Sequence, residues 1–214
     1  MACDSKRVLS LLCLCMLLVL PTSGQKMRDV FATMPDDVLE VMTKNNRLDC
    51  IDFIENNMEA KVRNRFDGYS VLQDMNDDYL KLFLTQNVQV EMKLLPVRDS
   101  IYYICLVKTY GERMKESTMT IYTSEWERLS LEEVFTHPVY DDYWKKNEHT
   151  DVDELKRLQA LQDMRFITMK LYPDSLRLDC ILQVGEVMDE ERERVEDMLQ
   201  PITFYWKEGC FVKR

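Results

Sequence analysis

Residues 78–123 read DYLKLFLTQNVQVEMKLLPVRDSIYYICLVKTYGERMKESTMTIYT. Four runs of alternating or mostly apolar residues follow one another in this stretch, separated only by short polar breaks. No break is long enough to hold a helix, so the pattern predicts an antiparallel meander. The run from Ile101 to Tyr110 is apolar on both faces, which is typical of a central strand covered on both sides.

The flanking sequence adds helices and further strands to this meander. Asp67-Gly68 is a hairpin turn signal, and Pro96 to Ser100 is expected to be a connection between strands. Apolar periodicity predicts helices near 34–42, 47–57, 131–136, 151–161 and 190–200, and more strands near 60–66, 69–75, 165–172, 176–184 and 202–212. The expected fold class is α+β, a curved antiparallel sheet with helices packed on one side.

The first 24 residues predict a secretory signal peptide. Lys6 and Arg7 precede the apolar run Val8 to Leu20, and Thr22 and Gly24 fit the small-residue positions of a cleavage site. The apolar run is too short for a membrane-spanning helix, which needs roughly 20 residues. We therefore expect an exported protein whose residues 25–214 form a single α+β domain, with a possible sub-division near 124–151.

Charge excludes one class of partner. The net charge is −10, and loss of Asp4, Lys6 and Arg7 with the leader makes it −11. A field of this sign repels phosphate backbones and anionic lipid surfaces. We expect no nucleic-acid partner and no transmembrane segment after cleavage.

Four cysteines follow the leader, and their spacing resembles no zinc or disulfide framework. Cys105 and Cys180 lie in apolar runs, where cysteine behaves as a small buried hydrophobe. An exported protein also permits disulfides, and four cysteines allow three pairings. Unpaired core thiols and disulfides therefore both stay open, for Cys50, Cys105, Cys180 and Cys210.

Motifs for common chemistries are missing from the sequence. The four glycines after the leader are far apart, so no glycine-rich phosphate loop is built. The two histidines, His137 and His149, do not form H-E-x-x-H, and no D-x-D-x-D-G calcium loop occurs. We expect no cofactor, no metal site and no assigned catalytic residue, and we lean against an enzyme.

One stretch is a candidate ligand site. Residues 137–144 read HPVYDDYW, in which aromatic rings lie beside carboxylates. Such a set can hold a sugar or a peptide by ring stacking and hydrogen bonds. The alternative is an aromatic lid that seals one end of the sheet. The candidate ligand-binding residues are His137, Tyr140, Asp141, Asp142, Tyr143 and Trp144.

A basic stripe stands out in this acidic chain. Lys61, Arg63 and Arg65 alternate with apolar residues in AKVRNRF. The stripe suits an acidic partner or a carboxylated glycan. The competing interpretation is the solvated face of an edge strand, where charge prevents the addition of another strand.

Several segments together resemble a known family. These are NNRLDCIDFIENN, DDYLKLFLT, VEMKLLP and IYYICLVKTYG, followed by a strand that ends near a Trp. They resemble a family of exported Bacteroidetes proteins that is catalogued only as a domain of unknown function. The resemblance implies a periplasmic or cell-envelope location in a Gram-negative bacterium, and it implies no active site.

Two hypotheses for function follow. The first is a non-enzymatic envelope protein that binds another protein, a glycan or a lipid-like ligand, or acts as a scaffold. The alternative is a hydrolase of envelope or dietary polymers that uses carboxylates near Asp141 and Asp142. A large apolar cavity favours a lipid carrier, whereas full packing of Leu39, Ile51 and Leu158 excludes one. Two facing carboxylates, one with a raised pKa, favour the hydrolase.

Overall fold

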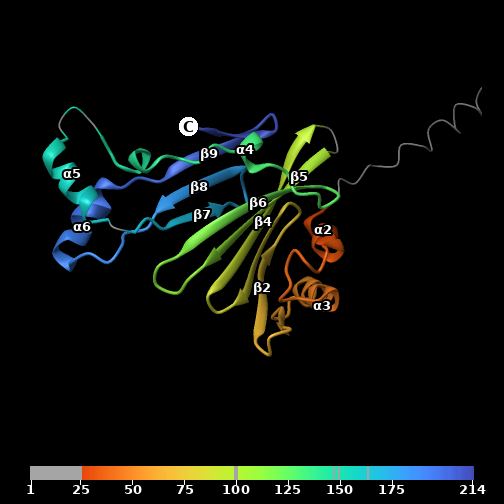
Figure 1. The fold of residues 1–214 in the computed structure, drawn as a ribbon. Coiled ribbons are helices and arrows are strands. Elements are labelled where there is room, and N and C mark those ends of the chain that lie inside the picture. The colour runs from red at the N-terminus through yellow and green to blue at the C-terminus, as the bar shows by residue number, and fades with distance from the viewer. Residues whose placement is uncertain (1–25, 99–100, 147, 149, 163) are drawn as a thin grey trace, which may run out of the picture.

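The computed structural model describes residues 26–98, 101–146, 148, 150–162 and 164–214 (Figure 1). The predicted signal peptide, residues 1–24, lies outside the described residues. Two antiparallel sheets form the molecule, and in Figure 1 α2 and α3 lie beside one sheet while α5 and α6 lie at the opposite end. Among the described helices, none has the length and apolar character that a membrane crossing requires.

The larger sheet is the predicted meander with two more strands on its N-terminal side. Its strands are neighbours in chain order, and every pairing is antiparallel. The α+β prediction with an antiparallel meander is therefore confirmed. The strands are β1 (Lys61–Arg63), β2 (Tyr69–Met75), β3 (Tyr79–Thr85), β4 (Val88–Arg98), β5 (Ile101–Tyr110) and β6 (Glu116–Thr123).

Two local features differ in how well the sequence predicted them. The Asp67-Gly68 turn forms, with Asp67 at φ 61°. The connection predicted from Pro96 is wrong, because β4 continues to Arg98. Pro96 pairs with Tyr102 of β5, beyond the end of β3, whose pairing with β4 starts at Tyr79. A missing amide hydrogen disrupts no ladder there, which is why proline is tolerated.

Alternation along these strands gives the sheet two distinct faces. The helix face is packed against α2 (Met27–Thr33) and α3 (Lys44–Glu55). The opposite face, here the sheet face, points toward the second sheet. The helix face carries Leu80, Leu82, Val90, Met92, Ile104 and Leu106, and the sheet face carries Tyr79, Lys81, Phe83, Glu91, Lys93 and Val107.

The helix predicted over residues 34–42 is wrong. The helix lies one segment earlier, at Met27–Thr33, and residues 34–43 form turns. Pro35 explains the difference, because a residue before proline is pushed out of the helical region. Met34 accordingly has ψ 133° and ends α2. The next helix was predicted correctly to within a few residues.

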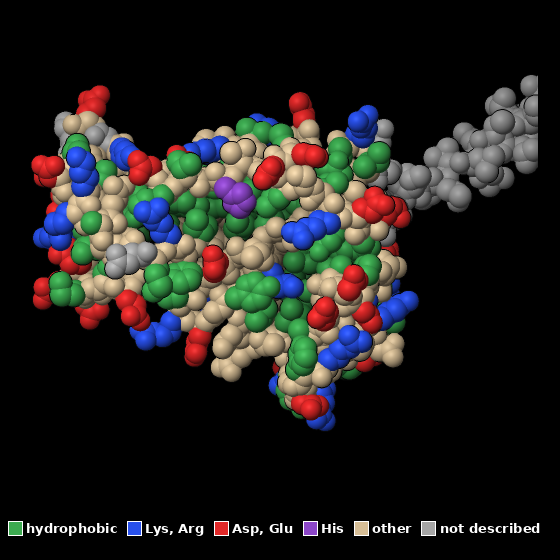
Figure 2. Space-filling model, in the orientation of Figure 1, with side chains coloured by type: hydrophobic (Ala, Val, Ile, Leu, Met, Phe, Trp, Pro, Cys, Tyr) green, Lys and Arg blue, Asp and Glu red, His purple; other side chains and the backbone are tan. Residues whose placement is uncertain are grey.

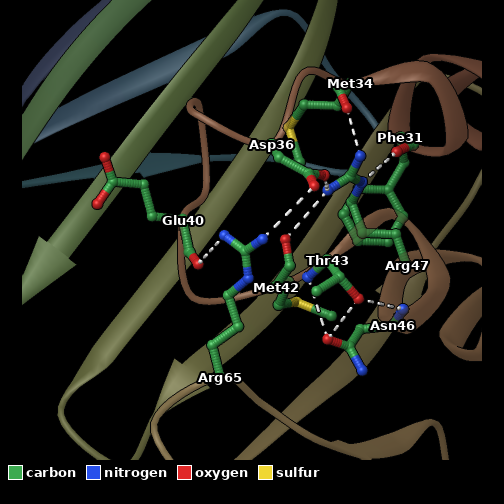
Figure 3. A network of polar contacts seen from close by, with 9 residues as sticks. All are labelled: Phe31, Met34, Asp36, Glu40, Met42, Thr43, Asn46, Arg47 and Arg65. Carbon is green, nitrogen blue, oxygen red and sulfur yellow. Dashed lines mark hydrogen bonds and ion pairs between the residues drawn. The ribbon is translucent and has the colours of Figure 1, made fainter.

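A buried guanidinium holds the turn segment in place (Figure 3). Arg47, on α3, is 1% exposed. It donates to the carbonyls of Phe31 at 3.1 Å, Met42 at 3.2 Å and Met34, and to the Asp36 carboxylate at 2.9 Å. These bonds satisfy carbonyls at the end of α2 and along the turn. The loop from α2 to α3 is thus closed around one side chain.

The smaller sheet has the order β10-β9-β8-β7. It packs with the remaining helices into a second apolar cluster, in which Trp144, Phe204 and Trp206 are large members. The sequence predicted these strands but not their separation into a second sheet. The elements are α4 (Leu131–Val134), η1 (Tyr140–Tyr143), α5 (Val152–Ala160), β7 (Ile167–Leu171), β8 (Arg177–Leu182), α6 (Asp189–Met198), β9 (Ile202–Lys207) and β10 (Cys210–Lys213).

We expect Arg47→Ala to lower the free energy of unfolding by about 3 kcal/mol, because it leaves buried carbonyls without a donor. Urea unfolding followed by circular dichroism measures the change. The matched control is Arg63→Ala, which removes an exposed ion pair to Asp67 and should change stability by less than about 1 kcal/mol. Equal losses in the two variants would contradict a special role for Arg47.

Candidate functional site: the cleft between the two sheets

Strand β7 lies with its unpaired edge against the sheet face of the larger sheet. The amide of Met169 donates to Ser117 Oγ at 2.9 Å, and the amide of Leu171 donates to the Glu91 carboxylate. Two residues further on, the carbonyl of Pro173 accepts from Lys93 Nζ at 3.0 Å. Side chains of the larger sheet thus satisfy alternate backbone groups along one edge of the smaller sheet.

Glu91 is the central group of this junction. It is 3% exposed, and Tyr79 donates its hydroxyl to Glu91 Oε1 at 2.7 Å. Burial raises the pKa of Glu91, although the Tyr79 and Leu171 hydrogen bonds and the charges of Lys81 and Lys170 act in the opposite direction. Burial, together with the neighbouring carboxylate, also raises the pKa of Tyr79, so Tyr79 keeps its proton.

A cleft of about 330 Å³ opens beside Glu91, between the sheet face and β7–β8. This volume suits a small ligand or one unit of a larger one. Its walls combine one aromatic ring, amides, hydroxyls and the ends of three lysines. The lining residues that matter here are Lys81, Phe83, Gln89, Glu91, Thr109, Lys115, Thr168, Lys170 and Gln183.

Three lysines gather at the cleft. Among the described parts of the chain, no carboxylate oxygen lies within 4.0 Å of the ammonium groups of Lys81, Lys115 or Lys170. Lys115 and Lys170 are exposed and Lys81 is half-buried. Three cations therefore face a cleft that holds one carboxylate, Glu91, in a protein of net charge −10. Elsewhere acidic and basic side chains are interspersed, as on the face in Figure 2.

The predicted ligand residues at 137–144 lie together, but their largest rings face inward. Tyr143 and Trp144 are 0% and 1% exposed and belong to the apolar cluster around the smaller sheet. The Tyr140 ring is covered by the Arg165 guanidinium, 3.8 Å from its centroid. His137 is exposed and packs its ring edge against Phe135, with centroids 4.8 Å apart. A sealing role for the aromatic rings fits this arrangement.

The two aspartates of that segment are each paired with a lysine. Asp141 lies 3.0 Å from Lys146 Nζ, and Asp142 lies 3.0 Å from Lys213 Nζ. The hydrogen bond from Lys213 lowers the pKa of Asp142. A groove does adjoin both aspartates, so ligand binding by residues 137–144 stays a prediction. A lowered pKa makes Asp142 a poor general acid.

The cysteines are free throughout the described part of the chain. Cys50, Cys105 and Cys180 are buried, and Cys210 is partly buried. Burial raises the pKa of Cys50 to about 11 and that of Cys180 to about 12, so both stay protonated at neutral pH and are poor nucleophiles. Within the same described residues, no three His, Cys, Asp or Glu side chains gather into a possible metal site.

Comparison with known proteins places the chain in a family. A family model described as "Protein of unknown function (DUF3256)" matches residues 19–211. The chain belongs to this family. Among curated proteins, none matches it.

A solved structure shares the fold. It is described as the structure of a domain of an uncharacterized protein from Porphyromonas gingivalis W83, with a TM-score of 0.73 and 23% sequence identity. The match covers 87% of this chain and 98% of that chain. At this identity the likeness shows the fold alone. It agrees with the resemblance to uncharacterised Bacteroidetes proteins inferred from the sequence.

Sequence reasoning missed the cleft because its residues are distant in the chain. Lys81 and Lys170 come from different sheets, and nothing in a linear pattern brings them together. One signal was available: β4 carries Glu91 and Lys93 in the middle of the meander, on a central strand. Charges at such positions need partners from another layer, and so they predict a polar contact above the sheet.

Glu91→Gln should abolish one pH dependence of stability. Because burial raises the pKa of Glu91, the folded protein holds this proton more tightly than the unfolded chain does. Stability from this group is therefore greatest at low pH and falls as pH rises above the ordinary glutamate pKa of about 4.3. The free energy of unfolding of E91Q minus that of wild type should increase as the pH rises above about 4.3.

Urea unfolding at fixed ionic strength measures this difference. Glu112→Gln, at an exposed position, is the control with which the E91Q curve is compared. A flat or falling curve for E91Q would contradict the raised pKa.

Tyr143→Phe tests the sealing role of the aromatic segment. The Tyr143 hydroxyl is buried and has no hydrogen-bond partner among the described residues. Removing it should leave stability unchanged or raise it by about 1 kcal/mol. Tyr79→Phe, which removes a hydroxyl bonded to Glu91, should instead lower stability by about 1–2 kcal/mol. Thermal unfolding of both variants measures these changes in stability. A large loss of stability in Y143F would contradict an unpaired Tyr143 hydroxyl.

Proposed function

We propose that this chain is an exported, non-enzymatic binding protein whose ligand carries negative charge and enters the cleft between the two sheets. The observation that carries the proposal is the meeting of Lys81, Lys115 and Lys170 at one cleft, with no carboxylate within 4.0 Å of any of them among the described residues. Unpaired cations in a partly enclosed site attract anions, and amide and hydroxyl groups beside them fix orientation.

Packing supports this ligand class over a lipid-like one. Leu39 and Ile51 are 1% and 2% exposed and fill the helix face of the larger sheet. Leu158, 2% exposed, belongs to the other apolar cluster. The cleft that does open is lined by Lys81, Gln89, Glu91, Thr109, Lys115, Thr168, Lys170 and Gln183 as well as by apolar side chains, which suits a charged, hydroxylated ligand better than a hydrocarbon chain.

The hydrolase alternative has less support. The raised pKa of Glu91 is the property expected of a general acid. Glycoside hydrolysis needs a second carboxylate facing the first. Among the described residues that line this cleft, Glu91 is the only one with a carboxylate. Its hydrogen bonds to Tyr79 and Leu171 also commit it to holding the two sheets together.

The location proposed is the periplasm or cell envelope of a Gram-negative bacterium. The leader pattern in residues 1–24 supports export. The solved structure of similar fold comes from Porphyromonas gingivalis, which is compatible with a bacterial envelope protein.

Titration with galacturonate tests the proposal, with galactose as the uncharged counterpart. Binding is followed by amide chemical shifts of the labelled protein. Galacturonate should bind and galactose should not, and the double variant Lys81→Gln/Lys170→Gln should weaken binding at least tenfold, or about 1.4 kcal/mol.

The control variant is Lys44→Gln/Lys207→Gln, which changes net charge equally at exposed positions outside the cleft. Its affinity should match that of wild type. Two results would contradict the proposal: equal weakening in both double variants, or a wild-type protein that binds neither galacturonate nor inorganic sulfate.

A further inference from the structure

Among the described residues, the smaller sheet covers only part of the sheet face of the larger sheet. The smaller sheet reaches β4, β5 and β6 through β7, and the strands β1 to β3 extend beyond it. On this uncovered part Tyr69 of β2 is 58% exposed, and Phe66, in the turn between β1 and β2, is 71% exposed. Two large exposed rings close together are typical of a contact surface.

These rings line a second groove, which joins the cleft. The groove has a volume of about 570 Å³, and its walls include Phe66, Tyr69, Val71 and Phe83. Phe83 and Gln86 line both the groove and the cleft. Val71 lies opposite Phe83 in the β2–β3 pairing, so the path crosses neighbouring strands at roughly 4.8 Å per strand. Cleft and groove therefore adjoin at Phe83 and Gln86, and together they are called the track.

Positive charge follows the rings along the track. Lys61 Nζ lies 4.7 Å from the centroid of the Tyr69 ring, and Lys81 Nζ lies 5.6 Å from that of Phe83. Of the predicted basic stripe, Arg63 is paired with Asp67 at 3.0 Å. Arg65 turns away and donates to the Glu40 carbonyl at 3.4 Å. Of the basic stripe, Lys61 is therefore the member that lies beside the groove, and Lys81 lies beside the cleft.

The backbone of these strands is paired over most of the face. β3 has a neighbour on both sides, whereas β1 covers β2 only over residues 69–71, with the Leu72 amide bonded to the Ala60 carbonyl. A peptide ligand adds to a free sheet edge, and the edge strand β1 is three residues long with Lys61 and Arg63 on it. The side chains that this face offers to a ligand are rings, amides such as Gln73 and Gln86, and ammonium groups.

We infer that the ligand is an extended anionic polysaccharide that runs from the cleft across Phe83 onto Tyr69 and Phe66. Sugar rings present apolar C–H faces to aromatic side chains, their hydroxyls bond amides, and carboxylate or sulfate groups pair with Lys61 and Lys81. This inference rests on the proposed function, and it adds that the ligand is a polymer with several units bound at once.

Polygalacturonate is the first probe, with its methyl-esterified form as the uncharged counterpart. Wild-type protein should bind polygalacturonate at least tenfold tighter per site than galacturonate, and should bind the ester far more weakly. Phe66→Ala/Tyr69→Ala should weaken polygalacturonate binding at least tenfold while leaving galacturonate binding unchanged. Both side chains are exposed, so the fold should tolerate their removal. Dextran sulfate replaces polygalacturonate in a parallel arm to separate sulfate from carboxylate ligands.

The matched control is Tyr110→Ala, which removes a half-exposed ring from the opposite face of the sheet. It should bind every probe as wild type does. Poly-glutamate tests the peptide alternative, and binding as tight as that of either polysaccharide would overturn the inference.

The two proposals fail in different ways. If Phe66→Ala/Tyr69→Ala binds both polysaccharides as wild type does, the extended track is wrong even when galacturonate still needs Lys81 and Lys170. If Lys81→Gln/Lys170→Gln binds galacturonate as wild type does, the proposed function is wrong, and the inference fails with it.

Discussion

The docking of one strand edge on a sheet face is the contact on which the two halves of this molecule depend. Strand β7 has an unpaired edge, which carries amides and carbonyls that must be satisfied once water is excluded. Ser117, Glu91 and Lys93, all buried on the sheet face, supply the partners. The cost of burying Glu91 and Lys93 is offset because each makes two hydrogen bonds, Glu91 with Tyr79 and Leu171 and Lys93 with Asp78 and Pro173.

This contact also sets where the cleft lies. β7 lies against the sheet face by its edge, so one face of the smaller sheet turns toward an apolar cluster and the other is left beside the larger sheet. The corner between them cannot be filled by helices, since α2 and α3 pack on the far side of the larger sheet. Thr168, Lys170 and Gln183 are on the outward face of β7 and β8 and therefore meet Lys81 and Gln89 across the corner. The edge-on docking of β7 therefore has two results. It joins the two sheets, and it leaves the cleft open beside the joint.

Local patterns were enough to predict most strands but not their assembly. Alternation predicted Tyr79–Thr85 and Ile101–Tyr110 nearly to the residue, because each depends on neighbours in the same hairpin. The error at 34–42 came from reading Pro35 as a helix start when it follows a helix end. The burial of Glu91 could not be predicted from local sequence patterns, because one of its partners is the backbone amide of Leu171, which lies in a distant strand. Aromatic content alone did not identify the exposed rings. Tyr143 and Trp144, which were candidate ligand residues, are buried in the core, whereas Phe66 and Tyr69, which were not candidates, are exposed.

In the described part of the chain, the two faces of the meander are covered to different extents. The helix face is closed by α2 and α3, whose connecting turn needs Arg47 buried at 1% exposure to hold it. Among the described residues, the cover on the sheet face reaches Tyr79 of β3 and leaves Tyr69, Val71 and Phe83 partly exposed, although these side chains are apolar enough to pack under a helix. An uncovered apolar strip beside a free edge invites aggregation. The charges on β1 and the lysines along the strip limit that risk, because like-charged copies repel at the strip itself. The same charges would attract an anionic chain to these rings. One set of residues would therefore both limit self-association and attract the ligand.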